Sequence, residues 1–99
     1  MRRAGRGVLC AMLAAATTAS AAPVAEPPPG ASACTGCHAT RADVIGPGPR
    51  LVGGKGHEML AALDGFRSGQ KPATVMDRIV RGFTRDELQA IVGWFAAQR

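Results

Sequence analysis

The sequence contains two cysteines separated by two residues and followed at once by a histidine, Cys34-Thr35-Gly36-Cys37-His38. This C-x-x-C-H pattern is typical of covalent attachment of a c-type haem. When the motif lies on a helix, the two thiols project from one face and each can add to a haem vinyl group. The neighbouring imidazole then points at the iron as a ligand. The pattern therefore predicts a chain that folds around one covalently bound haem c.

Three other interpretations of the cysteine pair are weaker. A redox-active dithiol favours a βαβ context, and no such pattern surrounds the motif. A disulfide between Cys34 and Cys37 would close too short a loop to stabilise the fold much. A zinc site needs four ligands, and His57 is the one histidine besides His38, so Asp or Glu would have to complete the set.

The size of the chain agrees with a bulky cofactor. The sequence has 99 residues, of which 4% are aromatic, and it contains no tyrosine. A domain this small buries a marginal core unless a disulfide, a metal or a cofactor reinforces it. Composition therefore argues against a large enzyme with its own catalytic cleft, and against a disulfide-rich scaffold.

The N-terminal segment has the order of a secretory signal peptide. Three arginines within the first six residues precede an apolar run over residues 8–16 and small residues over 17–22. Small side chains at Ala19 and Ala21 predict cleavage after Ala21 and export to the periplasm. The alternative is a membrane anchor formed by the uncharged stretch 7–25, but its polar residues weaken this hypothesis, so no stable membrane insertion is expected.

Removal of residues 1–21 changes both the charge and the cysteine count. The full chain carries a formal net charge of +5, whereas the 78 remaining residues carry nine basic and seven acidic side chains, a net charge of +2. Nucleic-acid binding therefore loses its main support. Cys10 leaves with the signal peptide, so only Cys34 and Cys37 remain in an oxidising compartment.

The rest of the chain predicts a proline-rich, disordered leader over residues 22–31 and one all-α domain over residues 32–99. No segment alternates like a strand. Thr84 and Glu87 predict a capping box at the start of the last helix. The predicted helices are 32–40, carrying the haem motif, 56–68, 76–80, and a last helix that runs from the Thr84 cap to about Ala97.

Three side chains are candidates for the second iron ligand. Met76 follows a proline-containing loop and opens a short helix, which suits presentation of its thioether to the haem. Met59 lies on the apolar stripe of the second helix, where a core methionine is expected. His57 lies in the first turn of that helix and is expected to face solvent, with bis-histidine ligation as the alternative.

Taken together, these residues resemble the class I c-type cytochromes. The matches, besides the C-x-x-C-H motif, are Pro49-Arg50-Leu51-Val52-Gly53, Met76, Phe83-Thr84-Arg85-Asp86-Glu87-Leu88 and Trp94-Phe95. The resemblance implies thioethers from Cys34 and Cys37, iron ligation by His38 and Met76, and a Pro49 carbonyl that accepts a hydrogen bond from His38 Nδ1. It also implies about four helices around one haem. Apolar residues expected to surround it are Leu51, Leu63, Phe66, Ile79, Ile91 and Phe95.

Residues 66–83 are similar to the haem domains in the cytochrome subunit of flavocytochrome c sulfide dehydrogenase. This resemblance implies an electron-accepting subunit whose partner is a flavoprotein dehydrogenase subunit. With two protein ligands the iron has no open position, so outer-sphere electron transfer is expected and the chain is not expected to be an enzyme by itself. The alternative is a free, diffusible cytochrome that serves other redox proteins between respiratory complexes.

Four basic residues lie near Met76 in the sequence. They either rim the exposed edge of the haem and steer an acidic partner, or form a solvated helix face. These residues are Lys71, Arg78, Arg81 and Arg85.

Overall fold

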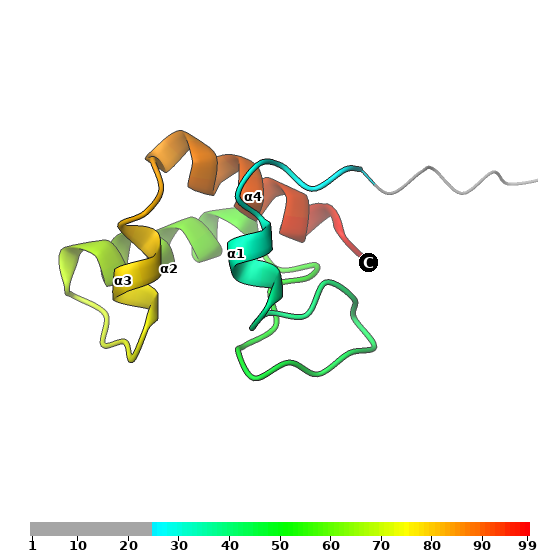
Figure 1. Cartoon of the computed structure of the whole chain (residues 1–99), viewed down its shortest axis with the longest axis horizontal. Coiled ribbons are helices and arrows are strands. Elements are labelled where there is room, and N and C mark those ends of the chain that lie inside the picture. The colour runs from blue at the N-terminus through cyan, green and yellow to red at the C-terminus, as the bar shows by residue number, and fades with distance from the viewer. Residues whose placement is uncertain (1–24) are drawn as a thin grey trace, which may run out of the picture.

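The computed structural model describes residues 25–99, and within this range it consists of helices and contains no strand. The predicted all-α fold is confirmed. The predicted signal peptide and its cleavage position after Ala21 lie outside the described residues. Figure 1 shows the four helices. They are α1 (Ser32–Thr35), α2 (Gly56–Ser68), α3 (Met76–Val80) and α4 (Arg85–Ala97).

Helix α4 begins at the capping box that the sequence predicts. The Glu87 backbone N–H donates to Thr84 Oγ1 at 3.2 Å, and the Thr84 N–H donates to Glu87 Oε2 at 2.7 Å. These two bonds satisfy N–H groups that have no partner inside the helix. The buried face of α4 consists of Leu88, Ile91, Val92 and Phe95, at helical spacing.

Helix α2 lies against both α3 and α4. It ends at Gly69, which adopts a left-handed conformation with φ of 79°, as is common after the last helical residue. Near this end the Arg67 guanidinium donates to the carbonyl of Val80 at 2.8 Å and to that of Phe83 at 2.7 Å. One side chain of α2 therefore holds the end of α3 and the turn before α4.

Helix α1 is shorter than predicted. The sequence predicts it over residues 32–40, but it ends at Thr35. The carbonyl of Cys37, which a longer helix would use for residue 41, accepts instead from the backbone N–H of Gly48 at 2.9 Å. The loop that follows the haem motif thus folds back onto the motif and replaces the continuation of the helix.

The described end of the proline-rich segment, which the sequence predicts to be disordered, packs against the helices. The indole N–H of Trp94 donates to the carbonyl of Ala25 at 2.8 Å, and Ala31 is fully buried. Gly30 has φ of 84° and packs closely against the ring of Phe83, and a positive φ at this contact favours glycine. In Figure 1 this segment runs beside α4.

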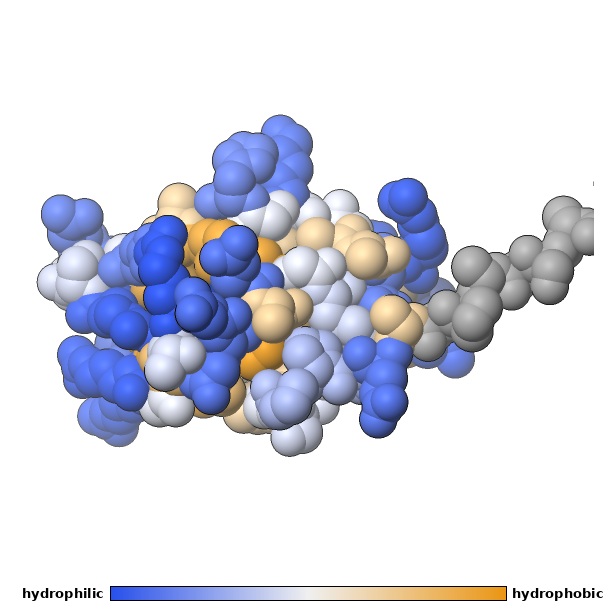
Figure 2. Space-filling model, turned by 90° about the horizontal axis from the view of Figure 1, so that it is seen from above, coloured by the Kyte–Doolittle hydropathy of each residue, from blue (hydrophilic) through white to orange (hydrophobic). Residues whose placement is uncertain are grey.

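The core of the described chain is small. One cluster joins α4 to the segment before α1 and to the loop before α2, and it consists of Ala31, Val52, Ile91 and Phe95. Figure 2 shows hydrophilic residues crowded over the end of the molecule where α2 ends and α4 begins, with apolar residues visible between them over small areas. No helix within residues 25–99 is both long and apolar enough to cross a membrane.

Candidate functional site

The helices and the loops between them enclose an apolar cavity of about 580 Å³, a volume in the range of small-molecule and cofactor sites. A second cavity of about 320 Å³ adjoins it, because the two share lining residues. All six apolar residues that the sequence places around the haem line one or both cavities. The shared lining residues are Cys34, His38, Pro49, Thr74 and Met76.

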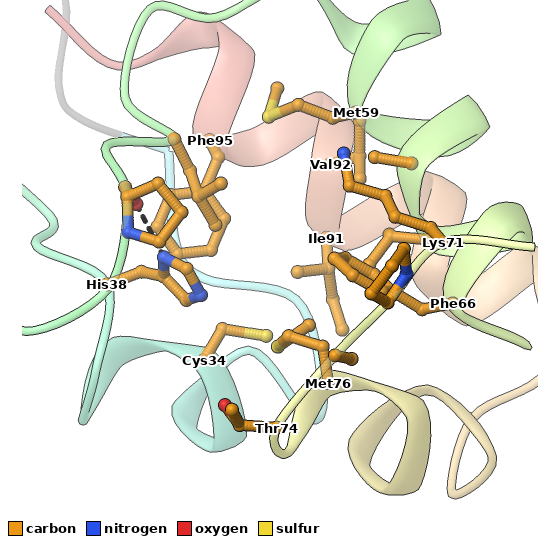
Figure 3. Close-up of a pocket in the computed structure, with 16 residues that line it drawn as sticks. Cys34, His38, Met59, Phe66, Lys71, Thr74, Met76, Ile91, Val92 and Phe95 are labelled. Atoms are coloured by element: carbon orange, nitrogen blue, oxygen red, sulfur yellow. Dashed lines mark hydrogen bonds between the residues drawn. The ribbon is translucent and has the colours of Figure 1, made fainter. Parts of the chain in front are cut away.

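His38 is buried, with 6% of its surface exposed. Its Nδ1 lies 2.6 Å from the carbonyl oxygen of Pro49, the hydrogen bond that the resemblance implied. Because a carbonyl oxygen only accepts, Nδ1 carries the proton, and in the neutral imidazole Nε2 then has a free lone pair. Figure 3 shows this bond as a dashed line, with the other ring nitrogen turned toward the interior of the cavity. The imidazole is thus held in the tautomer that a metal ligand requires.

The two cysteines of the motif are free thiols with different surroundings. Cys34 is half-buried and lines both cavities, whereas Cys37 is exposed and lines the smaller one. Burial raises the pKa of the Cys34 thiol, because a low-dielectric environment disfavours the thiolate. The backbone N–H of His38 donates to the carbonyl of Cys34 at 2.8 Å. This helical turn keeps both thiols and the imidazole at the edge of the same crevice.

Two methionines line the larger cavity, and their positions differ. Met76, the first residue of α3, also lines the smaller cavity and so lies in the region shared with His38. Met59 comes from α2, and its Sδ and Cε atoms lie against the Gly54 backbone, about 3.4 Å from where a Cβ would stand. Figure 3 shows Met59 and Met76 at opposite ends of the cavity.

His57, the alternative histidine ligand, faces solvent as predicted. Its side chain is 81% exposed, and the nearest charged group is Glu58, at 4.0 Å. His57 does not line either cavity.

The four basic residues near Met76 have different surroundings in the structure. Lys71 lines the larger cavity, with its Nζ 5.3 Å from the centre of the Phe66 ring. Arg85 donates to both carboxylate oxygens of Asp64, at 2.7 and 2.6 Å. That carboxylate raises the pKa of Arg85. Arg78 and Arg81 are exposed.

Several lining residues were not identified from the sequence. The segment 72–74 and Val92 complete the wall of the larger cavity, because the chain between α2 and α3 folds across its opening. The tight packing of the Gly46-Pro47-Gly48 segment against the haem motif was also missed. Its sequence signal was the alternation of glycine and proline just before Pro49.

The residues at this site fit the haem that the sequence predicts. Two thiols, an imidazole with a free lone pair and a thioether meet at one apolar crevice. Thiol, imidazole and thioether are the groups that attach and ligate a c-type haem. Within residues 25–99, no three side chains of His, Cys, Asp or Glu come together as a metal cluster.

Comparison with known proteins gives one informative similarity. The cytochrome subunit of sulfide dehydrogenase from Chlorobaculum tepidum is 32% identical over 62 residues. The chain resembles this cytochrome subunit. The aligned region covers 63% of the chain and 56% of the relative, so the chain spans little more than half of the relative's length. No family model and no solved structure matches the chain.

Proposed function

We propose that this chain is an exported, monohaem c-type cytochrome that transfers electrons by an outer-sphere mechanism. The observation that carries the proposal is the meeting of Cys34, Cys37, His38 and Met76 at one apolar crevice. The resemblance to the cytochrome subunit of the Chlorobaculum tepidum sulfide dehydrogenase supports it independently.

Each part of the site has a separate role in this proposal. When bound, haem supplies a one-electron redox centre. Cys34 and Cys37 hold it covalently, and His38, fixed by the Pro49 carbonyl, presents Nε2 to the iron. Met76 is the second ligand, and its soft thioether favours the ferrous state and raises the reduction potential. The apolar lining from α2 and α4 excludes water, which has the same effect on the potential.

The partner in this proposal is a flavoprotein subunit of a periplasmic sulfide dehydrogenase. The relative is by name the cytochrome subunit of a sulfide dehydrogenase, and residues 66–83 carry the resemblance within this chain. Export, with cleavage after Ala21, places the chain outside the cytoplasm. In this arrangement the flavoprotein oxidises sulfide, and the cytochrome accepts the electrons without taking part in substrate chemistry.

Haem staining after denaturing electrophoresis tests the core of the proposal. The full chain, produced in a host that matures c-type cytochromes, is expected to stain for haem at the mass of the form cleaved after Ala21. Unstained protein in a host that stains a control cytochrome would contradict haem attachment.

Purification from the native organism tests the partner. The expected result is a stable complex in which a flavin-containing subunit is identified by mass spectrometry and reduces the haem when sulfide is added. A haem-stained monomer that exchanges electrons rapidly with an oxidase, and that sulfide does not reduce in the cell extract, would favour the free carrier instead.

A further inference from the structure

The loop after the haem motif makes its closest approach to the motif at Gly48. A Cβ added at Gly48 would lie 2.8 Å from Cε1 and 2.9 Å from Nδ1 of His38, and 3.1 Å from the carbonyl oxygen of Cys37. Non-bonded carbon atoms pack best at about 3.5–4.0 Å. Position 48 therefore has no room for a side chain while the imidazole stays where it is.

The need for glycine at this position comes from space and not from backbone conformation. Positive φ angles occur within residues 25–99 at Gly30, Gly53 and Gly69, and Gly48 is not among them. Any residue can therefore adopt the backbone conformation of Gly48. The contact with the His38 ring is what restricts the side chain.

The same short segment also forms the hydrogen bonds that fix the motif. The Gly48 backbone N–H donates to the carbonyl of Cys37 at 2.9 Å, and the carbonyl of the next residue, Pro49, accepts from His38 Nδ1 at 2.6 Å. The His38 ring, the backbone of the motif and the loop are thus packed as one unit. Atoms that would meet a side chain at position 48 belong to a buried ring and to backbone, so an added side chain forces one of them to shift.

We propose that Gly48 is a positioning residue for the His38 imidazole, acting through its lack of a side chain. The proposal rests on His38 being an iron ligand, as in the proposed function. A methyl group at position 48 pushes the ring toward the cavity, the side on which it has open space. This movement lengthens the bond to Pro49 and changes the direction of Nε2.

Two other glycines provide controls. A Cβ on Gly46 would lie 2.7 Å from the carbonyl oxygen of Cys37 and 3.2 Å from the backbone nitrogen of Ala39, so it meets backbone and does not touch the ring. A Cβ on Gly93, an exposed residue of α4 outside the motif, meets nothing within 4 Å. Gly46→Ala thus separates disturbance of the loop from disturbance of the imidazole, and Gly93→Ala reports the effect of an added methyl group alone.

The test compares the three variants as full-length, haem-loaded proteins. All are expected to stain for haem, because both cysteines are intact. In Gly48→Ala we expect a changed pattern of haem-methyl shifts in the paramagnetic NMR spectrum, since this pattern reports the orientation of the axial imidazole. We also expect a more positive reduction potential, because a weaker bond at Nδ1 makes the imidazole a poorer donor. Gly93→Ala should keep the wild-type shift pattern and potential, and Gly46→Ala should lower stability with a smaller change in the shift pattern.

An unchanged shift pattern and potential in Gly48→Ala would overturn the proposal. If this variant does not accumulate, the wild-type protein decides. Its reduced form should show a nuclear Overhauser effect between the Gly48 α protons and His38 Hε1, and absence of this effect would overturn the proposal as well. Failure of the proposed function looks different, since it is a wild-type chain without haem staining.

Discussion

The two sides of the apolar crevice, marked by His38 and Met76, are held in different ways. His38 is fixed by its immediate sequence neighbourhood, through the Pro49 carbonyl and the loop that folds back within eleven residues. Met76 follows a stretch, residues 69–75, in which every residue is exposed. Its position depends on contacts made from α2, namely the bonds from Arg67 to Val80 and Phe83 and the bond from Lys71 N–H to the carbonyl of Gly65 at 3.0 Å.

Local structure therefore fixes the position of His38, whereas tertiary packing fixes the position of Met76. A fault in the loop after the motif acts directly on the imidazole. A fault in the contact between α2 and α3 acts on the thioether and leaves the imidazole in place. His38 and Met76, the two proposed iron ligands, should therefore be separable by mutation and by denaturant.

The largest expected effect is on the His38 side, in the double variant Cys34→Ser with Cys37→Ser. Covalent haem should be lost completely, and helical content should fall, because only seven apolar residues are buried within residues 25–99. Haem staining and far-ultraviolet circular dichroism measure the two effects. Thr35→Ala, inside the same motif, is the matched control and should keep both signals. A double variant that retains stained haem would rule out thioether attachment.

The next largest effect concerns the Met76 side alone. Met76→Ala should abolish the weak near-infrared charge-transfer band of a methionine bound to ferric iron while haem staining persists. Met59→Ala and His57→Ala are the controls, and both should keep the band, since Met59 packs against Gly54 and His57 faces solvent. Loss of the band in Met59→Ala instead would show that the ligand was assigned to the wrong methionine.

Weakening the contact between α2 and α3 should loosen the Met76 side first. Arg67→Ala removes two hydrogen bonds from a charged donor to backbone carbonyls, so the free energy of unfolding should fall by about 1–3 kcal/mol. In a guanidinium titration the near-infrared band should disappear at a lower concentration than helical structure does. Arg78→Ala, at an exposed position, should leave both midpoints unchanged. If the near-infrared band and the helical structure of Arg67→Ala are lost at the same guanidinium concentration, the two sides of the crevice are not held independently.

The smallest expected effect lies in α4, which packs behind both sides. Thr84→Ala removes the capping box and should lower the free energy of unfolding by about 1 kcal/mol. Since α4 contributes to the whole crevice, the near-infrared band and the haem-methyl shifts should stay as in the wild type. Chemical denaturation measures the stability, and Arg85→Lys serves as a control that keeps the cap. A changed shift pattern in Thr84→Ala would mean that α4 orients a ligand.

The parts of the fold that the sequence predicted best are those with local signals. Helix α2 ends and helix α4 begins where predicted, because Gly69 and the Thr84–Glu87 pair act within one turn of the chain, and α3 also has its predicted bounds. Helix α1 was predicted too long, since its end depends on the Gly48 N–H, eleven residues beyond Cys37. The packing of Ala25 on Trp94 was missed for the same reason, because 69 residues separate the two.

The site divides in a similar way. The C-x-x-C-H spacing predicted that Cys34, Cys37 and His38 lie together, and its resemblance implied the Pro49 contact that the structure contains. The position of Met76 after a loop predicted that its side chain lines the crevice. Met59 was expected in the core, and the sequence contained no signal that it lines the other end of the cavity. Which wall a side chain reaches is decided by how α2 packs on α3 and α4, and this packing is not encoded in any single segment.

The bond between Trp94 and Ala25 places the beginning of the described chain on its last helix. When the two ends of a domain lie close together, they can be joined and the chain opened at another exposed point. The residues then keep their neighbours in space. The two ends of the described chain are close together in space in this way. The described domain has the geometry of a unit that can be inserted within a longer polypeptide, or fused at either end, and keep its internal contacts.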